Sequence, residues 1–235
     1  MQEIELLHYD QKFRSKEAYK ILRTNIEFSG EEIHVITVTS CTPDEGKSQV
    51  SFELAESFAT AGKKVLLIDA DMRKSVMQVH FKNGKVRYGL VHVLVGKVAF
   101  DDAVCRTDIP GYDIIFSGPV PPNPSELLGG KHFEGVLKEA REKYDLVIID
   151  TPPLGSVIDS AIVAKQSDGV MLVIESGAIS YKFVQRMIQQ LKKAECKILG
   201  CVLNKVNMES NGGYYGSKYY GKYYGKYYGN YGDDK

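Results

Sequence analysis

Apolar runs and helical patterns alternate along the middle of the chain. Short runs rich in β-branched residues are typical of buried parallel strands, and the longer patterns between them are typical of crossover helices. The expected strands are residues 33–39, 64–68, 112–116, 145–149, 170–174 and 198–203. The expected helices between them are residues 47–61, 131–143, 156–166 and 179–194. This order predicts an α/β fold with a doubly wound, mostly parallel sheet.

Two segments flank this pattern. Residues 15–28 have a helical pattern, and the chain from about residue 210 is rich in glycine, tyrosine, lysine and asparagine. That last segment has too few aliphatic side chains to offset the entropy of ordering, so we expect it to be disordered. We therefore divide the chain into an N-terminal segment (1–30), a central domain (31–209) and a tail (210–235). Within the domain, GLVHVLVG at residues 89–96 indicates a helical lid or packing segment.

Composition excludes several classes of function. The 235 residues carry a formal net charge of zero, so no overall field favours nucleic acid or a membrane as partner. The sequence has no run of about 18 apolar residues, and we expect no transmembrane helix. The four cysteines lack CxxC spacing and the five histidines are scattered. This favours free thiols in a cytoplasmic protein and argues against a zinc site.

A phosphate-binding loop follows the first expected strand. Residues 40–48 read SCTPDEGKS, and the final GKS opens the next helix, which would aim backbone N–H groups at an anion. The strict pattern GxxxxGKS would require glycine in place of Cys41. The candidate nucleotide-binding residues of this segment are Thr42, Pro43, Asp44, Glu45, Gly46, Lys47, Ser48 and Gln49.

Acidic residues follow two other expected strands. Asp69 and Asp71 stand in IDADMR after the second strand, and Asp150 stands in IIDTPP after the fourth. Parallel strands present their carboxyl ends at one edge of the sheet, so these carboxylates should lie around the phosphate loop. With Lys47 reaching the β- and γ-phosphates and Ser48 binding the metal, the sequence predicts a site for ATP and Mg²⁺.

These motifs together resemble the bacterial tyrosine kinases (BY-kinases), specifically the soluble CpsD-type kinases of capsular or exopolysaccharide synthesis, over essentially the whole chain. That family has a loop SxxPGEGKS, here SCTPDEGKS, a DxDxR motif, here residues 69–73, and a DTPP motif, here residues 150–153. It also has a helix EAYRxLRTNI, here EAYKILRTNI at residues 17–26, and a terminal tyrosine cluster. The resemblance implies a P-loop NTPase fold of the deviant Walker type and ATP-dependent tyrosine autokinase activity.

The resemblance also implies roles for single residues. Lys47 would hold phosphate and serve catalysis. Ser48 and Asp71 would ligate Mg²⁺, with Asp150 reaching the metal directly or through water.

Three further roles concern the acceptor side and the nucleotide base. Asp69 would accept the proton of the attacking tyrosine, since a phenol needs only a positioned acceptor as its bond to phosphorus forms. Arg73 is also expected to serve catalysis. Asn204, after the last strand, lies where related NTPases hold the base.

Two departures from the family pattern stand out. Asp44 replaces a glycine of the loop and is expected to weaken ATP binding. Lys20 replaces the arginine of an ExxRxxR element, which keeps the charge and loses the bidentate fork. The family implies that Glu17, Lys20 and Arg23 mediate subunit contact, and the open alternative is that their helix is only a packed cover.

The tail holds nine of the fifteen tyrosines: Tyr214, Tyr215, Tyr219, Tyr220, Tyr223, Tyr224, Tyr227, Tyr228 and Tyr231. Beside a kinase site they are expected to be phosphoacceptors, reached between subunits of a ring. A sticky, adhesive tract is the alternative for the tail alone. The resemblance further implies a membrane adaptor that recruits the protein to the inner face of the membrane, and a tyrosine phosphatase. No nucleic-acid partner is expected.

A second function class competes with the kinase interpretation. Partition and division-site ATPases share the fold and carry KGGxGK[ST], with a signature lysine that would fall at residue 42. This chain has Thr42, followed by Pro43 and Asp44 in place of two glycines. The tyrosine-rich tail also favours the kinase over an ATPase switch.

Overall fold

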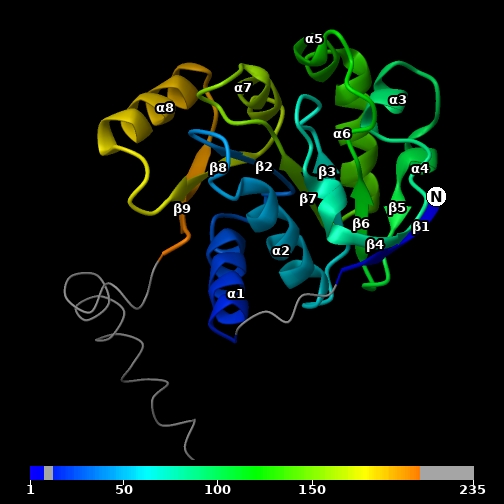
Figure 1. Ribbon diagram of the computed structural model, residues 1–235, viewed down its shortest axis with the longest axis horizontal. Helices are drawn as coiled ribbons and strands as arrows, with labels where there is room; N and C mark the ends of the chain where they lie inside the picture. Colours follow the sequence, from blue (N-terminus) through cyan, green and yellow to red (C-terminus); the bar gives the residue numbers. More distant parts are fainter. Residues whose placement is uncertain (8–12, 207–235) are drawn as a thin grey trace, which may run out of the picture.

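A single sheet passes through the part of the chain that the computed structural model describes, residues 1–7 and 13–206. The expected disordered tail, 210–235, lies outside those residues. The nine strands have the order β4-β1-β5-β6-β3-β7-β2-β8-β9 (Figure 1). Their bounds are β1 Gln2–Leu6, β2 Val35–Ser40, β3 Val65–Asp69, β4 Phe81–Gly84, β5 Cys105–Arg106, β6 Tyr112–Ile115, β7 Leu146–Asp150, β8 Gly169–Glu175 and β9 Ile198–Asn204. Only the β1–β4 and β5–β6 pairs are antiparallel, which confirms the mostly parallel sheet.

Helices cover both faces of the sheet. The long helices α1 (Phe13–Glu27) and α2 (Lys47–Ala59) lie side by side on one face (Figure 1). The helices of the other face are α3 Leu90–Leu94, α4 Phe100–Ala103, α5 Pro124–Leu128, α6 Lys131–Lys143, α7 Asp159–Ala164 and α8 Tyr181–Lys193. A 3₁₀ turn, η1 (Met77–His80), precedes β4.

The central strands are buried along their whole length because helices cover both of their faces. In β2, Ile36 and Val38 join the core under α1 and α2, whereas Val35 joins the core under α3 to α6. All six residues of β2 and all five of β3 and β7 are buried. Continuous apolar runs are what parallel strands covered on both faces require, and this is why the sequence pattern located them.

The sequence analysis missed the three strands at one end of the sheet. The segment 33–39 was expected as the first strand, but β1 precedes it and pairs with β4 and β5. These strands are short, and β4 ends in exposed residues, so no long apolar run marks them. GLVHVLVG is a packing segment, because α3 buries Leu90, Val91 and Leu94.

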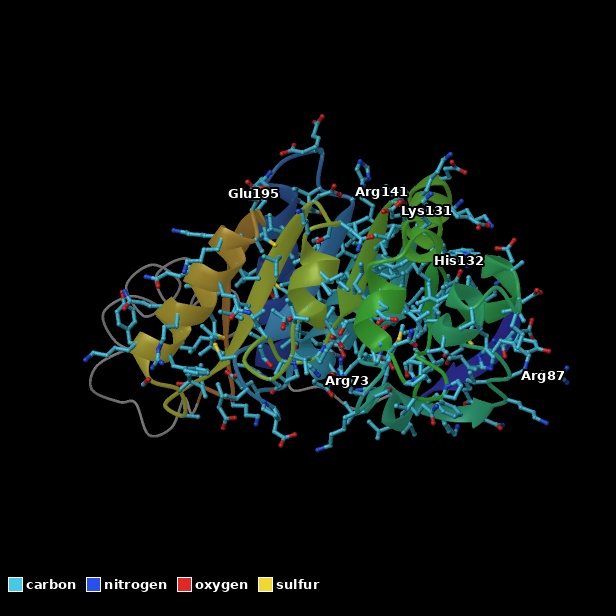
Figure 2. The ribbon with its side chains drawn as sticks, turned by 90° about the horizontal axis from the view of Figure 1, so that it is seen from above. Arg73, Arg87, Lys131, His132, Arg141 and Glu195 are labelled. Atoms are coloured by element: carbon cyan, nitrogen blue, oxygen red, sulfur yellow. The ribbon has the colours of Figure 1, made fainter. Side chains whose placement is uncertain are left out.

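An ion pair ties the amino edge of the sheet. The guanidinium of Arg141, in α6, donates to both carboxylate oxygens of Asp168 at 2.7 and 2.8 Å, and Asp168 also accepts from the backbone N–H of His34 and Val35. Figure 2 shows Arg141 at the edge opposite to Arg73. These contacts fix α6 and the starts of β2 and β8 to one another.

Two findings bear on the expectations from composition. Over residues 1–7 and 13–206, no helix combines the length and the apolar character needed to cross a membrane. Cys41, Cys105 and Cys196 are buried free thiols, and Cys201 is an exposed one.

A buried carboxylate in α2 predicts a pH-dependent stability. Glu53 is 7% exposed. Burial raises its pKa to about 7, although a hydrogen bond from Gln49 lowers the pKa in part. The folded chain therefore holds a proton that the unfolded chain releases near pH 4, and stability falls as pH rises toward and through 7. Glutamine carries no titrating proton, so we expect the free energy of unfolding of Glu53→Gln, relative to that of the wild type, to rise by about 2 kcal/mol from pH 5 to pH 8. Urea unfolding at the two pH values measures this, and a gap independent of pH would contradict it.

Candidate active site

The phosphate loop joins β2 to the first residue of α2, Lys47. Gly46 precedes the helix with φ 87°, a left-handed conformation that favours glycine. A Cβ on Gly46 would run into Nδ2 of Asn204, so a side chain here would have to displace Asn204. That Nδ2 donates to the carbonyl of Glu45 at 2.9 Å. Asn204, predicted to hold the base, therefore braces the loop from the end of β9.

Cys41 departs from the strict motif without strain. Its side chain is fully buried and packs in the cluster that holds Leu154 and Leu172. Among the described non-glycine residues, positive φ occurs only at Asp44, Glu195 and Lys205. The backbone at residue 41 is therefore one that any residue can adopt, and this start of the loop does not need glycine.

The side chain of Glu45 holds the loop together from inside. Its carboxylate is 1% exposed and accepts from the backbone N–H and the hydroxyl of Thr42. Its other oxygen accepts from the N–H of Glu175 at 2.9 Å. Glu45 thus shapes the loop from below, while Pro43 is exposed at the surface of the loop.

Asp44 lies in the loop with φ 64°, at the place of a family glycine. Its side chain is exposed, and its carbonyl accepts from Nζ of Lys205. A carboxylate here repels a bound triphosphate, so we expect Asp44→Gly and Asp44→Asn to bind ATP about fivefold more tightly. Asparagine tolerates the left-handed conformation and removes only the charge. Calorimetric titration with ATP measures this, and unchanged affinity in both variants would show that the carboxylate does not face the anion.

Lys47 is held among oxygen atoms. Its Nζ lies 3.3 Å from Oδ2 of Asp71 and donates to Oγ of Ser48 at 3.2 Å. Burial opposes the charge, but the carboxylates of Asp150 and Asp71 outweigh it and raise the pKa of Lys47. The ammonium is therefore charged at neutral pH, as a ligand of phosphate must be.

Asp69 and Asp150 end two adjacent strands. They are partners in the β3–β7 register, and each is almost fully buried. Burial raises the pKa of Asp69 to about 7, with the charge of Asp150 as the next cause. Burial likewise raises the pKa of Asp150 to about 6, although Lys47 opposes the shift. A pKa close to neutrality suits a proton acceptor.

Two residues that the sequence analysis missed contact Asp69. Its Oδ2 accepts from the hydroxyl of Ser75 and from the backbone N–H of Ser117 at 3.3 Å. Both donors lie in loops at the carboxyl edge, and no motif marks them. Ser51, another missed residue, donates to Asp150 at 3.4 Å and stands one turn after Lys47 in α2, so only the helical spacing could have suggested it.

Arg73 makes its contacts away from Lys47. Its guanidinium donates to both oxygens of Asp159 at 2.7 and 3.1 Å and to Oγ of Ser125 at 3.1 Å. Asp159 is fully buried at the start of α7, and Ser125 lies in α5. These contacts fix the segment after β3 to two helices, and a catalytic role for Arg73 stays a prediction.

The remaining predicted residues lie along α1 and α2. Gln49 donates to Glu53 in the same helix rather than to the loop. Lys20 pairs with Glu17 on the exposed side of α1 at 2.7 Å. Arg23 donates to the carbonyl of Ser57 in α2 at 2.6 Å, which is a contact within the subunit. The exposed Glu17–Lys20 pair thus suits a subunit contact, whereas the bond of Arg23 suits a helix that covers the core.

The oxygen atoms around Lys47 fit a magnesium ion. Ser48, Asp71 and Asp150 offer one hydroxyl and two carboxylates, the hard donors that Mg²⁺ prefers, and a bound triphosphate would add more. The cationic Lys47 already lies among these anions. The donor set is therefore consistent with a Mg²⁺–nucleotide site.

Fold and site together define a class of protein. A glycine-containing loop leads from β2, a central parallel strand, into a helix that begins with lysine. Asp150 and Asp69 end β7 and β3, the next two strands on one side of β2. This is the arrangement of a P-loop nucleotide-binding protein. The family model described as the AAA domain matches residues 33–202.

Similar proteins narrow the class. Tyrosine-protein kinase CpsD of Streptococcus agalactiae is 42% identical over 194 residues, which cover 83% of this chain and 85% of that protein. The kinase domain of Escherichia coli tyrosine kinase ETK superposes with a TM-score of 0.75 at 35% identity, covering 82% of this chain and 77% of that one. The cell division ATPase MinD of Pyrococcus furiosus has a TM-score of 0.60 at 24% identity, covering 72% of this chain and 71% of that one, a likeness that shows the fold alone. This chain therefore belongs to the bacterial tyrosine-protein kinases.

Proposed function

We propose that this kinase transfers the γ-phosphoryl group of ATP to the tyrosines of its own tail, Tyr214 to Tyr231, between subunits. The observation that carries the proposal is the position of Asp69. Asp69 is a buried carboxylate with its pKa raised to about 7, and it ends β3 beside Asp150 at the end of β7. The chain belongs to the tyrosine kinases, and its residues 214–231 hold nine phenols. A phosphate-binding lysine and a proton acceptor are what transfer to a phenol requires.

The roles follow from the contacts. Lys47 and the N–H groups of the loop would bind the phosphates, while Ser48, Asp71 and Asp150 would hold Mg²⁺. When bound, the metal neutralises phosphate charge and aligns the γ-phosphoryl group. Asp69 would take the phenol proton as the new O–P bond forms and ADP leaves.

Arg73 is better suited to positioning than to contact with ATP. Its paired bonds to Asp159 anchor the loop that follows Asp71, and the backbone N–H groups of Arg73 and Lys74 both donate to Oδ1 of Asp71. Arg73 would thereby hold the metal-binding carboxylate in place. Asn204 would act similarly on the loop, through the carbonyl of Glu45.

Transfer between subunits explains both ends of the chain. The tail lies outside the described residues, and its sequence contains many glycines and no aliphatic residue after Met208, a composition that suits a substrate segment rather than a core element. Each phosphate would add about −1.5 to −2 charges, so full modification would make the tail strongly anionic. We infer that this charge loosens a ring formed partly through Glu17 and Lys20 on the exposed side of α1.

The family resemblance supports a role in capsular or exopolysaccharide synthesis. We propose that a membrane adaptor recruits the protein to the inner face of the membrane and activates it, and that a tyrosine phosphatase reverses the modification. An ATPase switch without kinase activity is the alternative. The similarity to MinD supports that alternative only to the extent that the two proteins share a fold.

Intact-mass analysis after incubation with ATP and Mg²⁺ tests the proposal. We expect the full chain to gain several phosphoryl groups, and a chain ending at Ser210 to gain none on its remaining residues while it still binds ATP. ATP hydrolysis with no phosphoryl gain, even with an adaptor fragment present, would favour the ATPase switch.

A further inference from the structure

Ser75 lies at the surface beside the buried carboxylate of Asp69. The residue is exposed, yet its hydroxyl points inward and donates to Oδ2 of Asp69, which is itself fully buried. Ser75 follows the DxDxR motif by two residues and belongs to no part of it. An exposed serine whose hydroxyl contacts the proposed proton acceptor invites a functional explanation.

The hydroxyl of Ser75 has a fixed direction. Its Oγ accepts from the backbone N–H of Met77 at 3.3 Å, and Met77 is buried at the start of η1. A hydroxyl that accepts on one side must aim its single proton elsewhere, and Asp69 is the acceptor within reach. The chain of donors therefore runs from Met77 through Ser75 to Asp69.

The two oxygens of Asp69 differ in how many donors they receive. Oδ2 accepts from Ser75 and from the backbone N–H of Ser117, which occupy both of its lone pairs. Among the described residues, Oδ1 accepts only from the N–H of Asp71, at 3.2 Å. Within the part of the chain that the structure describes, one lone pair of Oδ1 is therefore left without a donor.

We propose that Ser75 is a positioning residue of the kinase, which fixes the Asp69 carboxylate so that Oδ1 accepts the proton of the attacking tyrosine. The inference rests on the proposed function, in which Asp69 is the proton acceptor. In the step, the phenol O–H bond breaks, its oxygen bonds to the γ-phosphorus, the proton moves to Oδ1 and ADP leaves. Ser75 neither gains nor loses a proton.

The test compares three variants of the full chain, assayed by tail phosphorylation with ATP and Mg²⁺. Removal of a hydrogen bond to a charged group is expected to lower the rate at saturating ATP by about 10- to 100-fold in Ser75→Ala. The ATP concentration for half-maximal rate should stay unchanged, because Ser75 contacts neither Lys47 nor the loop. Ser75→Thr keeps the hydroxyl and should restore the rate to within about threefold. Val76→Ala, an exposed neighbour, is the control for disturbance of the segment.

A double-mutant cycle shows whether Ser75 acts through Asp69. In an Asp69→Asn background, Ser75→Ala should cause no further loss, since the carboxylate that it positions is gone. An equal loss in both backgrounds, or an unchanged or faster rate in Ser75→Ala alone, would overturn the inference. If Asp69→Asn itself transfers phosphate at the wild-type rate, the assignment of the proton acceptor fails instead.

Discussion

Lys47→Met is expected to lower ATP affinity by at least about 100-fold and to abolish tail phosphorylation by that subunit. The ammonium is the cation that faces Asp71 and would face the phosphates. Breaking a buried charge pair typically costs about 3–5 kcal/mol, which corresponds to a loss of about two to four powers of ten in binding. Isothermal titration with ATP and Mg²⁺ measures the affinity, and Lys63→Met, on the exposed loop before β3, is the matched control.

The same substitution leaves buried carboxylates without their cation, so the variant must also be checked for folding. The charges of Asp150 and Asp71 raise the pKa of Lys47, and by linkage both carboxylates lose a favourable partner in the variant. A circular dichroism melt separates a folded, inactive chain from an unfolded one. A folded variant that keeps wild-type affinity and turnover would contradict the assignment of the phosphate site.

Asp69→Asn is expected to lower the rate of phosphoryl transfer by about 10²- to 10⁴-fold, the range for loss of a general base. ATP affinity should change little, because Lys47, Ser48 and Asp71 stay in place. The amide keeps the shape of the carboxylate but cannot take up a proton. Single-turnover phosphorylation at saturating ATP measures the rate, and titration measures the affinity. If both values match those of the wild type, Asp69 is not the proton acceptor.

The sequence predicted the centre of the fold well and its margin poorly. The strands β2, β3, β7 and β8 are buried on both faces, and continuous apolar runs mark such strands without ambiguity. The helices α2, α6, α7 and α8 begin and end within a few residues of the predicted bounds. By contrast β1, β4 and β5 have two to five residues each, and their pairing depends on contacts between distant parts of the chain. The pattern of apolar and polar residues within a short segment carries no information on such pairing.

The candidate site divides in the same way. Lys47, Asp69, Asp71 and Asp150 lie at strand or helix ends and carry motif signatures, so the rule that parallel strands share a carboxyl edge was enough to bring them together.

The contacts of Ser75, Ser117 and Asp159 depend on the path of loops. A sequence pattern does not fix that path, and no motif marked these residues. For two of the predicted nucleotide-binding residues the structure adds contacts within the protein, and their role toward the nucleotide stays a prediction. Glu45 bonds within the loop, and Asn204 bonds to its backbone.

The central claim is that one subunit phosphorylates the tail of another. The direct measurement mixes a full-length Lys47→Met subunit with an active subunit that ends at Ser210, adds ATP, Mg²⁺ and an adaptor fragment, and maps phosphate by peptide mass spectrometry. The account predicts phosphotyrosine between Tyr214 and Tyr231 of the inactive subunit, which can receive phosphate only from its partner. No phosphate on that tail, while the intact wild-type chain modifies its own under the same conditions, would contradict transfer between subunits.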